Sequence, residues 1–182
     1  MNFPWLFGGL FLLLNGLEDT FPVLLAAILH ECGHGLACLV LGVPIRFFRP
    51  TAAGAVIGYD PSALSYTREA WIALSGPLAN LAGVLVCFPG ECGRMRALFG
   101  ISSLALAVFN LLPIRHLDGG VLLTSLLLPR LGVMRGEIFC EKISRIFTFL
   151  LWICAVSVQM RCGGNLSLLL ISVYLLTKIA GE

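Results

Sequence analysis

Residues 24–42 read LLAAILHECGHGLACLVLG, a stretch that combines a long apolar run with three ionisable side chains. His30, Glu31 and His34 are separated from one another by only a cysteine and a glycine, and apolar residues flank them on both sides. About 20 mostly apolar residues are enough for a helix to cross the hydrocarbon core of a bilayer. Ionisable groups within such a helix are costly to bury and mark candidate functional sites. The stretch therefore predicts a membrane helix that carries a functional site.

The composition of the whole chain agrees with this interpretation. Of its 182 residues, 58% are hydrophobic and 12% are charged, and the mean hydropathy is +0.95. A soluble domain usually carries about 25% charged residues. We therefore expect an all-α integral membrane protein whose residues 1–182 form a single polytopic domain in the lipid bilayer. The formal net charge of +2 and the lack of a basic cluster give no indication of a nucleic-acid partner.

Hydropathy predicts about six transmembrane helices. The segments are roughly Phe3–Leu17, Phe21–Leu41, Arg68–Phe88, Ala97–Leu112, Ile143–Met160 and Leu166–Ile179. The apolar segment Leu117–Leu128 is expected to extend the fourth span beyond a break at Pro113. With six spans, eight Lys and Arg residues fall on one side of the membrane and three on the other, and Arg115, near the break, is left out of the count. The positive-inside rule then predicts a multi-pass protein of the cell membrane with both termini in the cytoplasm.

The segment 43–65, VPIRFFRPTAAGAVIGYDPSALS, is too polar and too rich in proline and glycine to be a span. Its AGAVIGY run has residues typical of strands between glycines, which predicts a short β-hairpin or re-entrant segment after the second helix. Such backbone lies at membrane depth only where protein buries it or where it lines a wet cavity. An ordinary cytoplasmic loop is the alternative.

The spacing of the two histidines points to a metal site. His30 and His34 are four residues apart, so their side chains share one helix face and can bind one ion. Glu31 beside them can act as a general base on a water that the ion holds. This is the H-E-x-x-H arrangement of zinc metalloproteases. The structural alternative is a hydrogen-bonded polar cluster between helices, and the position inside an apolar span favours the metal site.

A third metal ligand must come from another part of the chain, because a catalytic zinc usually has three protein ligands and one open position. Residues 110–120 read NLLPIRHLDGG, where a proline breaks the helix and two glycines allow close approach. We expect Asp118 to be the third ligand. His116 is a rival, since a site of three histidines is chemically sound, and a salt bridge between Asp118 and Arg115 is the structural alternative.

A third motif, SGPLAN at residues 75–80, lies inside the third predicted span. Its glycine and proline are expected to bend the helix or to allow close packing. Asn80 carries an amide that must find hydrogen bonds when it is buried. It is either part of the site or a polar contact between two helices, and the residues alone leave both open.

Taken together and in this order, HECGH, SGPLAN and NLLPIRHLDGG resemble the motifs of the site-2 protease family of intramembrane zinc metalloproteases. The motifs span residues 30–120 and all fall in predicted membrane segments. The run FNLLPI with the following LDGG is further similar to the bacterial branch that processes sporulation sigma factor precursors.

The resemblance implies a zinc ion held by His30, His34 and Asp118, with Glu31 as the catalytic base. Asn80 and Asn110 match family asparagines near the site, which implies contact with the substrate backbone or the developing oxyanion. It further implies six helices, an active site nearer the cytoplasmic face, and regulated intramembrane proteolysis. The expected substrate is a membrane protein such as a sigma factor precursor or an anti-sigma factor.

Many members of this family carry a PDZ or a CBS domain, and we expect neither in this chain. We then expect the protease activity to be controlled by a regulatory membrane partner or by the supply of substrate. The alternative function is a non-enzymatic membrane zinc-binding protein or zinc transporter. A transporter needs metal ligands along a path across the membrane, whereas these motifs give ligands at one depth, so the protease is favoured.

Overall fold

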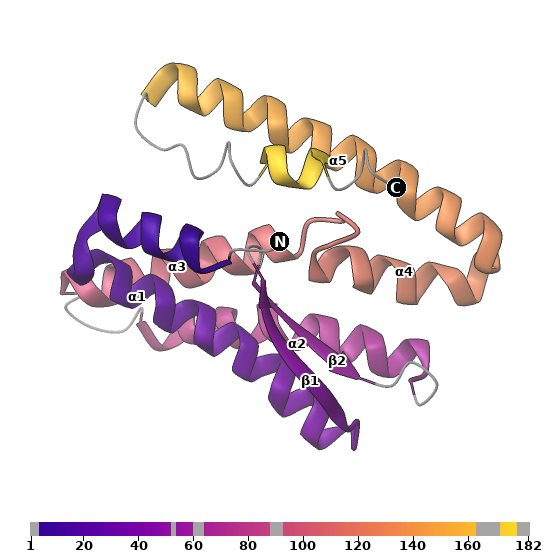
Figure 1. Ribbon diagram of the computed structural model, residues 1–182. Helices are drawn as coiled ribbons and strands as arrows, with labels where there is room; N and C mark the ends of the chain where they lie inside the picture. The colour runs from indigo at the N-terminus through magenta and orange to yellow at the C-terminus, as the bar shows by residue number, and fades with distance from the viewer. Residues whose placement is uncertain (1–3, 52–53, 60–63, 88–92, 163–171, 178–182) are drawn as a thin grey trace. The chain divides into compact units, whose positions relative to one another are not determined.

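The computed structural model describes residues 4–51, 54–59, 64–87, 93–162 and 172–177 (Figure 1). Of residues 4–19, 46–51, 54–59 and 162 it describes the backbone alone. The chain divides into two compact units, Met1–Leu111 and Leu112–Glu182. The first contains α1 (Pro4–Val40), β1 (Ile45–Thr51), β2 (Gly54–Tyr59), α2 (Tyr66–Cys87) and α3 (Arg94–Asn110). The second contains α4 (Asp118–Leu131), α5 (Val133–Cys162) and a helical stretch over residues 172–177.

One face of α1 is buried along a single row of side chains. Pro22, Ala26, His30, His34 and Cys38 follow one another at intervals of four residues, and each of them is buried. Residues at this interval lie above one another on a helix. Most of the side chains on the other faces of this stretch are apolar and half-buried or exposed, as lipid contact requires. Both histidines therefore point into protein.

The close packing of α1 against α2 depends on small residues. A Cβ atom added to Gly33 of α1 would lie 2.6 Å from the carbonyl oxygen of Ser75 and 2.8 Å from Cβ of Ala79. Real atoms do not approach so closely, so only glycine allows this separation of the two backbones. The buried face of α2 includes Gly76, Pro77 and Asn80, so the SGPLAN motif faces protein.

The segment after α1 forms a two-stranded antiparallel sheet. β1 and β2 pair with Phe48 opposite Ile57 and Arg49 opposite Val56, and the register shifts between Ile45 and Phe47. The chain leaves α1 through Gly42, whose φ of 65° is the left-handed conformation that glycine adopts without strain at the end of a helix.

The second unit begins with an irregular turn. Residues 111–117 separate α3 from α4, so Leu117–Leu128 belongs to a helix of its own and does not extend the preceding one. The physical reason is Pro113, which cannot donate the hydrogen bond that a continuous helix needs. Gly132, at a φ of 78°, separates α4 from α5. α5 begins ten residues before the predicted span, because charged residues in 133–142 hide its first turns from a hydropathy search.

Three of the described helical stretches are long and apolar enough to cross a membrane, namely Thr20–Val40, Tyr66–Cys87 and Val133–Arg161. They correspond to the predicted spans Phe21–Leu41, Arg68–Phe88 and Ile143–Met160. The predicted first span falls in the part of α1 described by backbone only, and most of the predicted last span, Leu166–Ile179, lies outside the described residues. The fourth corresponds to the shorter α3. The chain is thus a mainly helical membrane protein.

Candidate metal centre

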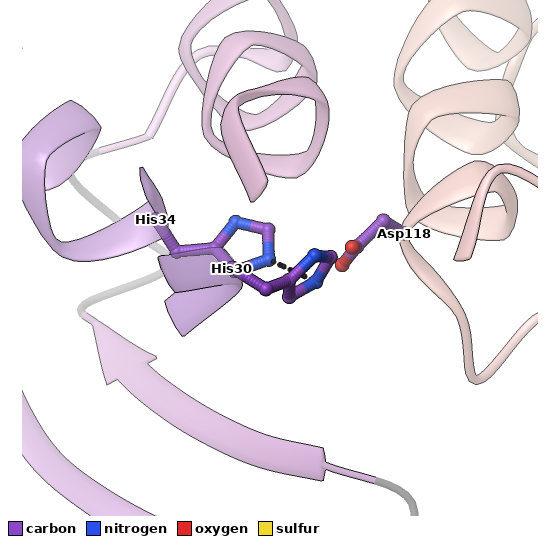
Figure 2. Close-up of side chains that lie close together, drawn as sticks. All are labelled: His30, His34 and Asp118. Atoms are coloured by element: carbon purple, nitrogen blue, oxygen red, sulfur yellow. Dashed lines mark hydrogen bonds between the residues drawn. The ribbon is translucent and has the colours of Figure 1, made fainter. Parts of the chain in front are cut away.

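The two histidines of α1 turn the same ring nitrogen toward each other. Nε2 of His30 and Nε2 of His34 are 3.1 Å apart, and the dashed line in Figure 2 joins them. The ring centroids are 4.7 Å apart and the ring planes are inclined by 83°. Both side chains are buried, at 6% and 8% exposure. The pair is therefore a compact, dry set of nitrogen donors inside a candidate membrane span.

A backbone carbonyl of α2 fixes the orientation of His34. Nδ1 of His34 donates to the carbonyl oxygen of Ile72 at 2.7 Å, and the hydroxyl of Ser75 donates to the same oxygen at 2.6 Å. A carbonyl can only accept, so Nδ1 carries the hydrogen. In the neutral ring, Nε2 of His34 is then the acceptor nitrogen, whose lone pair can bind a hydrogen or a metal ion. Metal-binding histidines typically use their second nitrogen in this way.

A side chain of α2 contacts His30. Nδ2 of Asn80 donates to Nδ1 of His30 at 3.1 Å. The side chain of Asn80 is fully buried. Two positions of α2, eight residues apart, thus contact the Nδ1 atoms of two histidines that are four apart on α1.

The geometry of the pair fits a tetrahedral metal ion. Two nitrogens that are each about 2.0–2.1 Å from one zinc ion lie about 3.3 Å apart, and the two Nε2 atoms are 3.1 Å apart. Gly76 makes room for this arrangement, because a Cβ atom there would collide with Nε2 of His34 and lie 2.8 Å from Cε1 of His30. The donor set and its surroundings therefore suit zinc.

Glu31 follows His30 on α1, and its side chain is half-buried with one carboxylate oxygen, Oε2, inaccessible to solvent. Glu31 lies in the same turn of α1 as His30. A carboxylate so placed can take up and release a proton next to the metal position.

Asp118 is the first residue of α4 and is half-buried, whereas Arg115 and His116 in the preceding turn are exposed. Figure 2 draws the Asp118 carboxylate at the start of its helix. Gly120 lets the turn fold back on α4, because a Cβ atom there would collide with the carbonyl oxygen of Ile114. Asp118 belongs to the second unit, and its role as third ligand stays a prediction.

Asn110 ends α3, and its Nδ2 donates to the carbonyl oxygen of Leu106 in the same helix at 3.0 Å.

A predominantly apolar cavity of about 510 Å³ lies over α1 and α2, with Gly33, Leu36, Trp71 and Ser75 in its lining. The Ser75 hydroxyl is 3.5 Å from Nδ1 of His34. Ser75 therefore connects this cavity to the histidine pair.

Two parts of the site were missed from the sequence. The Ile72 carbonyl could not be predicted as a partner of His34, because every residue has a backbone carbonyl. The role of Gly76 was interpreted as bending or packing of the helix, whereas its position shows that it makes room for two imidazole rings. The available signal was the SGPLAN motif itself, in which Gly76 precedes Asn80 by four residues, so that both share one helix face.

No protein-family model matches the sequence. The chain is 27% identical over 158 residues to a protein of Synechocystis sp. named "Putative zinc metalloprotease sll0528", a match of 82% of this chain and 41% of that protein. The chain thus spans about two-fifths of the length of this curated relative.

A solved structure gives the fold. The site-2 protease from Methanocaldococcus jannaschii matches with a TM-score of 0.63 and 21% sequence identity, over 97% of this chain and 84% of the other. The chain has the site-2 protease fold. The resemblance to the site-2 protease family that the three motifs indicate is confirmed by these two matches, while the similarity to its sporulation branch stays a prediction.

Proposed function

We propose that the chain is an intramembrane zinc metalloprotease that hydrolyses peptide bonds of membrane-associated polypeptides in or near the bilayer. The observation that carries this proposal is the buried histidine pair, whose Nε2 atoms are 3.1 Å apart while Nδ1 of His34 is bonded to the backbone of α2. The 3.1 Å separation suits a hydrogen bond as well as a shared zinc ion, and the H-E-x-x-H spacing inside an apolar span favours the ion. The name of the Synechocystis relative, which includes zinc, supports the same metal.

The proposed ligands are His30, His34 and Asp118. When bound, zinc supplies Lewis-acid activation of water and of the scissile carbonyl. The chain's own contribution is to hold two imidazoles in fixed orientation and to exclude bulk water around them, since both rings are buried. A carboxylate as the third ligand completes a donor set that catalytic zinc sites use.

Glu31 is the proposed catalytic base. One of its carboxylate oxygens takes the proton of the attacking water and passes it to the leaving amide nitrogen, so that both products leave neutral at the cleaved bond. The substrate must be extended at this point, because the hydrogen bonds and side chains of a helix shield its peptide bonds. The β1–β2 sheet has two edges, and an extended segment can add to such an edge by backbone hydrogen bonds.

We further propose six membrane spans with both ends of the sequence in the cytoplasm. Three described helical stretches meet the length and hydropathy of a span, and the unequal distribution of Lys and Arg supports the orientation. Tags at Met1 and Glu182 should give the same side in a protease-protection assay. Tags on opposite sides would show that the number of spans is odd.

The proposed biological role is regulated intramembrane proteolysis that releases a transcription or sigma factor, under the control of a membrane partner. Its support is the resemblance of the FNLLPI and LDGG runs to the sporulation branch. Co-expression of the chain with a candidate sigma factor precursor or anti-sigma factor, followed by mass spectrometry of the products, identifies the cleaved bond.

The test of the function is Glu31→Gln in the purified full chain. This change removes the base without removing a proposed ligand, so zinc content should stay at the wild-type level. Cleavage should fall by about 10²–10⁴-fold, the usual contribution of a general base. Turnover near that of the wild type would overturn the assignment of Glu31. Zinc flux into vesicles without any cleavage would favour the alternative of a transporter.

A further inference from the structure

Asn80 has an unusual position for a residue expected to contact substrate. Its side chain is fully buried, and its Nδ2 lies 3.1 Å from Nδ1 of His30. Its other end, Oδ1, is also buried and has no hydrogen-bond partner among the residues that the structure describes. Leaving a buried acceptor unsatisfied destabilises the folded protein, so such an atom calls for an explanation.

Metal binding by His30 would explain this buried acceptor. With Nε2 of His30 bound to a metal, the hydrogen of the neutral ring lies on Nδ1. Nδ1 then needs an acceptor, and the amide of Asn80 lies within hydrogen-bond distance of it, at 3.1 Å. The two ends of an amide have nearly the same shape, so a half-turn about χ2 exchanges Nδ2 and Oδ1 without any change in volume. Oδ1 then accepts from Nδ1 of His30, and Nδ2 takes the buried position that Oδ1 had.

We infer that Asn80 is a positioning residue for the metal site, which accepts the Nδ1 hydrogen of His30 through Oδ1 and so directs Nε2 toward the metal. This inference rests on the proposed zinc site. It assigns to Asn80 the role that the Ile72 carbonyl has for His34, where Nδ1 donates at 2.7 Å. Asn80 acts on the reaction through His30 and makes no contact with the substrate.

α2 then orients both imidazole rings of α1 through two groups at equivalent positions. Ile72 and Asn80 are separated by two turns of α2 and hold the Nδ1 atoms of His34 and His30 respectively. Gly76 lies midway between them and leaves the space that the imidazoles fill. One acceptor comes from the backbone and is insensitive to substitution, whereas the other comes from a side chain. Only the His30 half can therefore be tested by changing one residue.

The experiment measures zinc affinity by competition with a chelator, using the full chain purified in detergent. Asn80→Leu keeps a similar volume and removes the acceptor, and its zinc affinity should fall by about 10–100-fold, the usual effect of losing such a partner. Asn80→Asp keeps an acceptor in the same place, and its affinity should stay within about threefold of the wild type. A Co²⁺-substituted sample gives a second readout, because the visible spectrum should change in the leucine variant and persist in the aspartate variant.

Thr148→Val is the matched control. Thr148 is fully buried in α5, and the valine removes a buried hydroxyl at equal size. Its zinc affinity should equal that of the wild type, which separates loss of a buried polar atom in general from loss of the His30 partner. If Asn80→Leu does not accumulate as folded protein, Asn80→Ala is measured in its place against the same threshold.

Zinc affinity within twofold of the wild type in the folded leucine or alanine variant would overturn the inference. A loss of more than tenfold in Asn80→Asp would do the same, because an acceptor alone would then not be sufficient. Both outcomes leave the protease function intact as long as the wild type binds zinc and cleaves. A wild-type chain that binds no zinc in the same assay would instead refute the proposed function.

Discussion

The two histidines and Asp118 are held by opposite kinds of local structure. His30 and His34 lie inside a long helix, on its buried row, and each Nδ1 contacts α2. Asp118 begins a helix, directly after the irregular turn of residues 111–117. The orientation of the two histidines therefore depends on the packing of two helices. The position of Asp118 depends instead on a turn and on the glycines that let the turn close. We call these the histidine side and the aspartate side of the proposed site.

The largest effect on zinc should come from Asp118 itself. Asp118→Asn keeps the shape of the side chain and removes its charge. Zinc affinity should fall by more than about 100-fold, since even the hydrogen-bond partners of metal ligands contribute about 10–100-fold. His116→Ala is the matched control from the same turn, and its purified protein should retain zinc. Full zinc in Asp118→Asn together with empty His116→Ala protein would indicate a site of three histidines.

The next effect tests the packing on the histidine side. In Gly76→Ala the new methyl group collides with Nε2 of His34 and approaches Cε1 of His30. Zinc affinity should fall by about 10–100-fold because both rings must move, and overpacking should lower the free energy of unfolding by about 1–3 kcal/mol. Gly35→Ala is the control on α1, where a Cβ atom meets no other atom within 4 Å. Equal zinc affinity in the two variants would show that packing does not set the pair.

A smaller effect tests the turn on the aspartate side. The backbone N–H of Arg115 donates to the hydroxyl of Ser144, which is buried in α5, at 2.9 Å. Ser144→Ala removes this support and should cost about 0.5–1.5 kcal/mol of stability. Zinc affinity should fall by less than about tenfold, because Gly120 and the helix start still hold Asp118 in its turn. Ser157→Ala on the same helix removes an exposed hydroxyl that donates to the carbonyl oxygen of Ile153, and it should change neither quantity.

The smallest effect on zinc should come from β2, which contributes no proposed ligand. Val56→Pro or Ile57→Pro removes a backbone donor from a strand and should slow cleavage while zinc content stays unchanged. Val56→Thr keeps the donor and serves as the control in a comparison of cleavage rates. Normal cleavage by both proline variants would mean that the sheet takes no part in substrate handling.

The sequence by itself determined the features that depend on spacing and composition. A separation of four residues places His30 and His34 on one helix face whatever the rest of the chain does. The apolar runs required membrane helices, and Pro113 required a break between α3 and α4. The first turns of α5 were missed because their charged residues belong to a helix that a hydropathy pattern cannot recognise.

Only the tertiary structure decided which groups meet the histidines. The Ile72 carbonyl and the Asn80 amide lie 38 and 50 residues from their partners, and no local periodicity encodes contacts at such a distance. They follow from the close approach of two helices at Gly33 and Gly76, which is a property of packed surfaces. The motif could indicate that SGPLAN belongs near the site, but the side of α2 that faces α1, and the nitrogen that each group contacts, are fixed by packing.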